Sequence, residues 1–206
     1  MSTTTRRGFL RQAGGALTGA AAAPYILTSS ALGQGGRPPA GERIATAHIG
    51  VGSRGSGLLG EFISLPDVQC VAVVDCFRSR RETVANGVNQ RYGDQGCAAY
   101  GDFREVLARD DIDAIVVATH DVWHVPLTTA FARAGVDAYV EKPLGMSIEE
   151  DLTAREICRR YGTIFQYGTQ QRSMPHCRYG CELVRNGRLG EIRAIEVIAP
   201  AGGTGG

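Results

Sequence analysis

The sequence predicts an α/β protein built on a doubly wound parallel sheet, with the start of a truncated α+β domain behind it. Strand-like and helix-like runs alternate strictly between Ile44 and Tyr167, the pattern of strands joined by crossover helices. Residues 113–118 are apolar on both faces, as a strand inside a parallel sheet has to be. A glycine-rich turn from Gly50 to Gly55 separates the first strand from the first helix.

Six strands and the helices between them are expected in chain order. The predicted strands cover residues 44–49, 71–75, 97–100, 113–118, 137–140 and 163–167. The predicted helices begin near residues 53, 79, 103, 125 and 148. A helix over 175–185, a turn at 187–190 and a strand over 192–198 then begin another domain. A lone strand lacks partners for its backbone groups, so the rest of that domain is expected beyond Gly206.

Composition places the chain among globular proteins and narrows its function. Hydrophobic residues make up 43% and charged residues 21% of the 206 positions. A formal net charge of +1 gives no basic footprint for nucleic acid, and no apolar stretch is long enough for a permanent membrane span. The patterns divide the chain into a targeting segment over 1–33, a linker over 34–43, the sheet domain over 44–170 and the incomplete domain over 171–206.

The first 33 residues have the features of a targeting segment. Arg6 and Arg7 precede Phe9 and Leu10, a mildly apolar run follows, and small residues at 31–33 suit a signal peptidase. Paired arginines before Phe-Leu resemble the twin-arginine signal, whose export machinery carries folded proteins. Export to the periplasm or cell exterior is therefore expected. The alternative interpretation is an amphipathic or disordered tail.

The six cysteines do not form the framework of a small disulfide-rich domain. Cys177 and Cys181 lie one helical turn apart with His176 beside them, but no fourth ligand stands at a matching spacing. We therefore predict no metal site and expect the cysteines to be buried free thiols.

The glycine-rich turn has the spacing of a dinucleotide-binding loop. Gly50 makes the tight turn, Gly52 lets the backbone approach a pyrophosphate, and Gly55 lets the helix pack against the strand. Ser53 and Arg54 begin the helix, whose N-terminus faces the phosphates. The loop therefore predicts a Rossmann domain that binds NAD or NADP.

Asp75 favours NAD. It stands 20 residues after Gly55, at the end of the second strand, where an acid accepts hydrogen bonds from the ribose hydroxyls. Its charge would repel the 2′-phosphate of NADP. Arginines at positions 78, 80 and 81 leave NADP open, because arginines just past this strand accommodate that phosphate.

Other polar residues follow the carboxyl ends of later strands, where ligands of such sheets bind. The candidates for cofactor or substrate contact at these ends are Ala118, Thr119, His120, His124, Glu141, Lys142, Gln170 and Arg172. Lys142 is the only lysine among 22 basic residues. A lysine ammonium can exchange a proton at working pH, which a guanidinium cannot.

Three motifs together resemble the Gfo/Idh/MocA oxidoreductases, over residues 43–198. They are Gly50-Val51-Gly52-Ser53-Arg54-Gly55, Ala118-Thr119-His120-Asp121-Val122-Trp123-His124 and Glu141-Lys142-Pro143. The resemblance implies that Lys142 is the catalytic lysine, reaching the nicotinamide ribose and the reacting hydroxyl of a sugar or polyol. It also implies that Glu141 and Gln170 contact the cofactor and that His124 orients its loop.

The chain departs from the family at two positions. The family usually has proline after Thr119 and often histidine before Trp123, where this chain has His120 and Val122. His120 is a candidate substrate contact or a satisfied loop histidine, and Arg172 is a candidate substrate contact or a surface charge.

The predicted function is NAD-dependent hydride transfer between tightly bound cofactor and a carbohydrate-like secondary alcohol. The alternatives are NAD-dependent glycoside cleavage by transient oxidation and a non-catalytic nucleotide-binding module. The resemblance implies a second domain for substrate binding and oligomerisation, with an acid/base Asp–His pair, and a homo-oligomer at full length.

Overall fold

The computed structural model describes residues 32–33 and 37–198. The targeting segment predicted over 1–33 therefore lies outside the described residues, except for Leu32 and Gly33. Arg37, in the predicted linker, donates to the carbonyl of Val68 at 2.9 Å and lies over the ring of Tyr92. Within the described part of the chain, no helix has the length and apolarity to cross a membrane.

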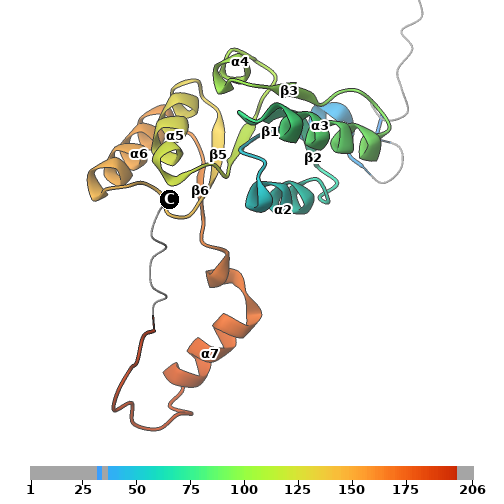
Figure 1. Ribbon diagram of the computed structural model, residues 1–206. Helices are drawn as coiled ribbons and strands as arrows, with labels where there is room; N and C mark the ends of the chain where they lie inside the picture. The colour runs from blue at the N-terminus through green and yellow to red at the C-terminus, as the bar shows by residue number, and fades with distance from the viewer. Residues whose placement is uncertain (1–31, 34–36, 199–206) are drawn as a thin grey trace, which may run out of the picture.

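Six parallel strands form one sheet in the order β3-β2-β1-β4-β5-β6 (Figure 1). This order confirms the predicted doubly wound fold. The strands are β1 (Ile44–Ile49), β2 (Val68–Val74), β3 (Ala98–Tyr100), β4 (Ala114–Val117), β5 (Asp137–Glu141) and β6 (Phe165–Gly168).

Helices cover both faces of this sheet (Figure 1). The α-helices are α2 (Ser53–Phe62), α3 (Arg78–Tyr92), α4 (Phe103–Leu107), α5 (His124–Arg133), α6 (Ile148–Tyr161) and α7 (Pro175–Arg185). Three short 3₁₀ helices are η1 (Ala40–Glu42), η2 (Asp121–Trp123) and η3 (Gln170–Ser173). Helices α2 and α3 lie on one face, and α5, with α6 beside it, lies on the other.

The core is divided by the sheet into two apolar layers. On the α5 face, Leu127 and Phe131 are almost fully buried against Ile115 and other residues of the central strands. On the other face, Leu59 of α2 and Val88 of α3 pack on the sheet. Burial of each such side chain stabilises the fold by about 1.5–3 kcal/mol, which fixes the strand ends that carry polar residues.

Local signals set the helix boundaries. The hydroxyl of Ser147 accepts a hydrogen bond from the backbone N–H of Glu150 and starts α6, and Gly162 ends it in the left-handed region with φ 70°. Asp102 and Glu105 form a capping box that starts α4. The Asp102 cap lies in the loop between β3 and α4, at the carboxyl edge of the sheet.

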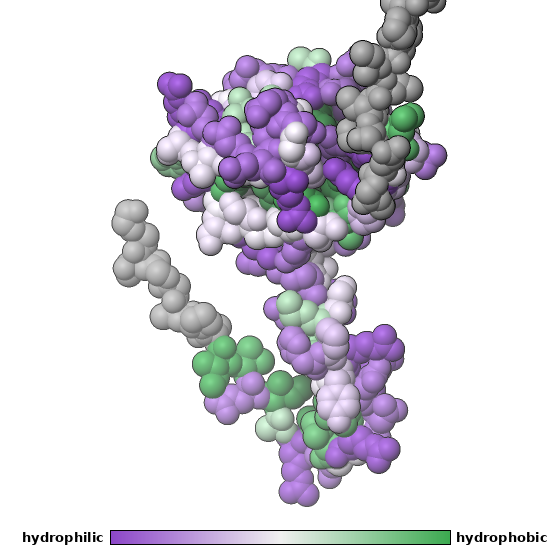
Figure 2. Space-filling model, turned by 90° about the vertical axis from the view of Figure 1, so that its right-hand side faces the viewer, coloured by the Kyte–Doolittle hydropathy of each residue, from purple (hydrophilic) through white to green (hydrophobic). Residues whose placement is uncertain are grey.

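The segment after β6 stands away from the sheet domain (Figure 1). No residue of α7 is buried, and residues 191–198 form no strand. The prediction of a strand over 192–198 is therefore wrong, because within the described residues no strand lies beside this stretch to pair with it. Figure 2 shows apolar surface on this segment, and the exposed apolar residues there are Tyr179, Val184, Leu189, Ile192, Ile195, Val197 and Ile198.

The cysteines are all free, but only half are buried. Cys70, Cys97 and Cys158 are buried, as predicted. The prediction is wrong for Cys76 and Cys181, which are exposed, and for Cys177, which is half-buried. Cys76 follows β2 at the carboxyl edge of the sheet, and the other two lie on α7, which buries nothing. Among the described residues, no three His, Cys, Asp or Glu side chains gather as metal ligands.

Candidate functional site

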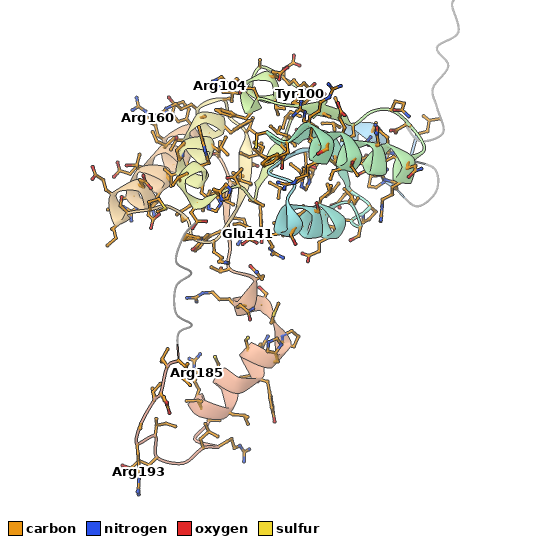
Figure 3. The ribbon with its side chains drawn as sticks, viewed as in Figure 1. Tyr100, Arg104, Glu141, Arg160, Arg185 and Arg193 are labelled. Carbon is orange, nitrogen blue, oxygen red and sulfur yellow. The ribbon has the colours of Figure 1, made fainter. Side chains whose placement is uncertain are left out.

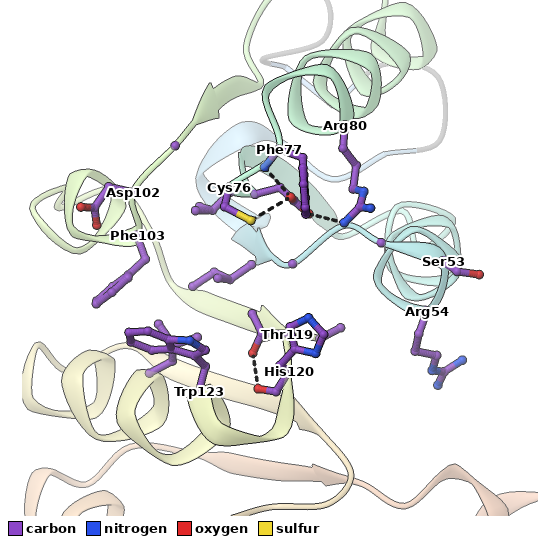
Figure 4. Close-up of a pocket in the computed structure, with 18 of the residues that line it drawn as sticks. Ser53, Arg54, Cys76, Phe77, Arg80, Asp102, Phe103, Thr119, His120 and Trp123 are labelled. Atoms are coloured by element: carbon purple, nitrogen blue, oxygen red, sulfur yellow. Dashed lines mark hydrogen bonds and ion pairs between the residues drawn. The ribbon is translucent and has the colours of Figure 1, made fainter. Parts of the chain in front are cut away.

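A pocket of about 510 Å³ lies at the carboxyl ends of β1, β2 and β4 (Figure 4). β1 and β4 are neighbours, and the chain leaves them in opposite directions across the sheet. Such a switch point is where doubly wound sheets bind ligands. The pocket walls include most of the predicted cofactor residues: Gly50, Gly52, Ser53, Arg54, Asp75, Ala118 and Thr119, together with His120.

The three glycines of the loop have distinct geometric roles. Gly50 has φ +82°, and a Cβ there would lie 2.7 Å from the carbonyl oxygen of Ala118. A Cβ on Gly55 would lie 1.9 Å from the carbonyl oxygen of Gly50, so only glycine lets α2 start this close to the loop. A Cβ on Gly52 would instead meet only Arg80 Nη1, in ordinary contact at 3.6 Å. The loop therefore presents bare backbone to the pocket.

Asp75 joins the end of β2 to the glycine loop. Its carboxylate is buried and accepts hydrogen bonds from the backbone N–H groups of Val51, at 3.1 Å, and Phe77, at 2.9 Å. Arg80 Nη1 lies 3.5 Å from Asp75 Oδ2, a contact drawn in Figure 4. Asp75 therefore holds the glycine loop in place and also lies beside the guanidinium of Arg80.

The other two arginines after β2 are directed elsewhere. Arg78 pairs with Glu82 at 2.7 Å on the outside of α3. Arg81 donates to the backbone carbonyls of Asp75 and Cys76. Of the three arginines left open for a 2′-phosphate, Arg80 alone lines the pocket.

An aromatic pair forms a wall that the sequence did not predict. The rings of Phe103 and Trp123 lie 6.2 Å apart. Figure 4 shows the two rings together on one side of the pocket, with Arg54 and Ser53 on the other side. Arg104 lies over the ring of Phe103. Both aromatic residues follow carboxyl ends of strands, the same signal that identified the polar candidates, and so this rule was sufficient to find them.

His124 lies behind the pocket, fully buried, and joins two loops. Its Nε2 lies 3.2 Å from the carbonyl oxygen of Thr119, and its Nδ1 contacts the carbonyl oxygen of Pro143. The Lys142–Pro143 peptide bond is cis. The imidazole thus links the loop after β4 to the Glu-Lys-Pro segment.

The predicted residues at the end of β5, just beyond it and after β6 lie outside the pocket walls. Glu141 is buried and pairs with Arg54 at 2.7 Å, at the edge of the domain near the segment that carries α7 (Figure 3). With its amide oriented to suit its neighbours, Gln170 accepts a hydrogen bond from Arg54 Nη2 at 3.2 Å. Lys142 and Arg172 are exposed. The structure therefore brings Arg54, Glu141 and Gln170 together.

Comparison with known proteins identifies the family. The profile of the Gfo/Idh/MocA group, described as an oxidoreductase family with an NAD-binding Rossmann fold, matches residues 44–169. The chain belongs to this family. Residues 44–169 are the whole sheet domain with its pocket, so the family match and the observed topology agree.

Curated relatives of the family match over a longer stretch. A glycosyl hydrolase family 109 protein of Shewanella baltica is 27% identical over 91% of this chain. One from Shewanella sp. strain MR-4 is 29% identical, and an α-N-acetylgalactosaminidase of Shewanella oneidensis is 27% identical, each over 91% of this chain. The chain spans 44% of the length of each of these relatives.

Solved family structures share the fold. Myo-inositol 2-dehydrogenase of Lactobacillus plantarum has a TM-score of 0.64 at 25% identity, covering 73% of this chain and 43% of its own. GenD2 from gentamicin A biosynthesis, solved in complex with NAD, has a TM-score of 0.61 at 26% identity, covering 71% of this chain and 40% of its own.

Proposed function

We propose that this chain binds NAD and supports hydride transfer between the nicotinamide and a secondary alcohol of a sugar or polyol. The observation that carries the proposal is the bare glycine loop held against the Asp75 carboxylate at the β1–β4 switch point. Lys142, the only lysine, follows β5, the strand next to β4.

The pocket fits the cofactor. Gly52 and the N-terminus of α2 suit a pyrophosphate, because no side chain caps this helix and its first backbone N–H groups have no partner within it. The Asp75 carboxylate suits ribose hydroxyls, and its charge favours NAD. Arg80 beside it offsets only part of that charge, so the carboxylate would still repel the 2′-phosphate of NADP, which is the less favoured ligand. When bound, the nicotinamide accepts or donates the hydride.

Lys142 would act on the substrate hydroxyl. Its ammonium is exposed at the carboxyl edge of the sheet, so a hydroxyl can reach it. A lysine placed there polarises the alcohol and exchanges its proton with a neighbouring base. Glu141 would act on the site through Arg54 and through the backbone of Lys142, since its side chain is buried.

A second candidate function is NAD-dependent glycoside cleavage by transient oxidation. The names of the curated relatives favour it, since they denote glycosyl hydrolases and an α-N-acetylgalactosaminidase. It begins with the same oxidation of a ring hydroxyl, so the same cofactor pocket would serve. The Glu141-Lys142-Pro143 motif, which carries part of the resemblance to the oxidoreductases, favours the plain oxidoreductase.

One experiment separates the two candidates. The protein, purified in the form its own organism makes, is denatured to identify the released nucleotide by chromatography. The native protein is then mixed with sugars and polyols, and reduced nicotinamide is followed by its near-ultraviolet absorbance. Accumulation of reduced cofactor supports the oxidoreductase. Release of the aryl group from an aryl N-acetylgalactosaminide without net reduction supports the glycosidase, and absence of bound nucleotide and of both reactions overturns the proposal.

We also propose that residues 1–33 direct export through the twin-arginine pathway. The support is the pair Arg6 and Arg7 ahead of Phe9 and Leu10, with the apolar run that follows them. Because this pathway carries folded proteins, the nucleotide would be acquired before export.

A further inference from the structure

Two segments that lie 87 residues apart in the sequence meet at one ion pair. Arg54 Nε donates to Glu141 Oε1 at 2.7 Å, and Arg54 Nη2 lies 2.7 Å from the same oxygen. The Glu141 side chain is only 5% exposed. A carboxylate buried to this degree needs a cation and hydrogen bonds nearby, and Arg54 supplies both.

The second oxygen of the same carboxylate holds the backbone of the next residue. Glu141 Oε2 accepts a hydrogen bond from the Lys142 N–H at 3.1 Å. β5 ends at Glu141, so Lys142 is the first residue beyond the strand. The carboxylate therefore connects the guanidinium of Arg54 to the backbone amide of Lys142.

Arg54 is itself fixed at the phosphate-binding loop. It is the second residue of α2, between Ser53 and Gly55, at the edge of the pocket (Figure 4). Gln170 accepts from its Nη2 at 3.2 Å. Partial burial lowers the pKa of Arg54, but the hydrogen bond and charge of Glu141 outweigh this and hold that pKa above its usual value. The guanidinium is therefore committed to Glu141.

We infer that Arg54 is a positioning residue that, through Glu141, fixes the backbone of Lys142 relative to the phosphate-binding loop. The significance of this link rests on the proposed function, in which Lys142 meets the substrate. The loop that receives the cofactor phosphates and the segment that carries the lysine are thereby held as one unit.

The sequence offers a direct probe of this link. Lys142 is the only lysine, so the chain grown with ¹⁵N-lysine has one labelled backbone amide, and a Lys142→Arg variant assigns its signal by removing it. In the parent chain we expect one signal that exchanges slowly with water. Arg54→Met should move this signal and make the amide exchange about tenfold faster, because the hydrogen bond to Glu141 is no longer held in place.

Arg80→Met is the matched control. Arg80 also lines the pocket and pairs with a buried acid, with side-chain exposures of 45% and 5% in that pair against 42% and 5% for Arg54 and Glu141. Among the described residues, its ion pair is with Asp75, and it makes no hydrogen bond or ion pair with Glu141 or Lys142, so the signal should stay in place. If Arg54→Met fails to fold, Glu141→Gln tests the same link, because it removes the carboxylate charge with which Arg54 pairs.

The outcomes separate the inference from the proposed function. An Arg54→Met or Glu141→Gln chain whose Lys142 signal and exchange rate equal those of the parent would overturn the positioning role. An equal change in Arg80→Met would also overturn it, because the effect would then be general destabilisation. NAD is titrated into the parent chain as a separate arm. If Arg54→Met changes the Lys142 signal but NAD does not change the parent spectrum, the link from Arg54 to Lys142 is supported and the proposed function is contradicted.

Discussion

The carboxylate of Asp75 accepts a hydrogen bond from the backbone N–H of Val51, so the acid that follows β2 also holds the glycine loop. A second bond, from the N–H of Phe77, fixes the turn into α3. Its two oxygens are thus already placed by the protein before any ribose reaches them. A preorganised acceptor of this kind loses little freedom on binding.

Replacing Asp75 with asparagine should weaken NAD binding by about 1–3 kcal/mol, because a charged acceptor for the ribose hydroxyls is lost. NADP should lose less affinity, since the charge that repels its 2′-phosphate is removed while Arg80 remains. Calorimetric titration with both nucleotides measures this, with Asp102→Asn, at another acid that lines the pocket, as the control. Equal losses for NAD and NADP would contradict the role of Asp75 in cofactor choice.

Two glycines of α2 should respond to alanine in opposite directions. At Gly55 the new Cβ would lie 1.9 Å from the Gly50 carbonyl oxygen, so we expect a loss of about 3 kcal/mol or more in the free energy of unfolding. At Gly57 nothing lies within 4 Å, and alanine should stabilise the helix by about 0.5–1 kcal/mol. Urea unfolding of both variants measures the difference, and similar midpoints would contradict the packing described for the loop.

His48 should make the fold sensitive to acid. It is buried beside Phe62, its Nδ1 has no partner, and burial lowers its pKa from 6.5 to about 3. Between these values the unfolded chain takes up a proton that the folded chain refuses. Stability should therefore fall as the pH drops from about 6.5 to about 3, by up to about 1.4 kcal/mol per pH unit, with no contribution above that window.

The variant His48→Leu tests this assignment. It removes the proton uptake, so its unfolding free energy should fall less steeply with acid than that of the parent in urea titrations at several pH values. His176→Gln, at an exposed position on α7, should follow the parent curve. Parallel curves for His48→Leu and the parent would show that other groups cause the acid sensitivity.

Replacing Lys142 with arginine should keep the charge and most of the NAD affinity while lowering hydride transfer by roughly 10²–10⁴. The guanidinium cannot exchange a proton at working pH and is broader than an ammonium. Lys142→Met should behave similarly. Single-turnover reduction of bound NAD by the best sugar or polyol measures the rate. If the arginine variant reacts at nearly the parent rate, Lys142 contributes only its positive charge and does not exchange a proton.

Replacing Arg6 and Arg7 together with lysine should keep the protein in the cytoplasm, because the export signal depends on paired guanidinium groups. Cell fractionation followed by immunoblotting measures the distribution. Arg11→Lys, outside the pair, should be exported as the parent is. A double variant found in the periplasm would refute the twin-arginine assignment.

Most of the fold followed from local patterns, and the shifted start of one strand has a physical cause. β2 begins at Val68, three residues before the predicted start. Its pairing with β1 passes from Cys70 directly to Ala72, so Val71 is an extra residue in the ladder. Such a bulge breaks the period-two alternation by which strands are recognised. The loop glycines and Asp75 were found because their spacing is local.

Contacts across the fold were not predictable in the same way. Phe103 and Trp123 share a wall because α4 packs on the same face of the sheet as α5, an arrangement that the alternation of elements does not specify. The pairing of Arg54 with Glu141 had to be chosen from 22 basic and 21 acidic residues. The position of each residue in the sequence therefore identified both as site candidates. That they form an ion pair with each other could be seen only in the tertiary structure.

The wall formed by Trp123 gives the molecule a built-in optical reporter. Trp123 is the only tryptophan of the chain, it lines the candidate pocket, and its side chain is partly open to solvent. Indole emission depends on the polarity and mobility of its surroundings, and here all of it comes from one wall of one site. A change in that emission on adding a nucleotide would thus report events in the pocket, without any label and without waiting for turnover.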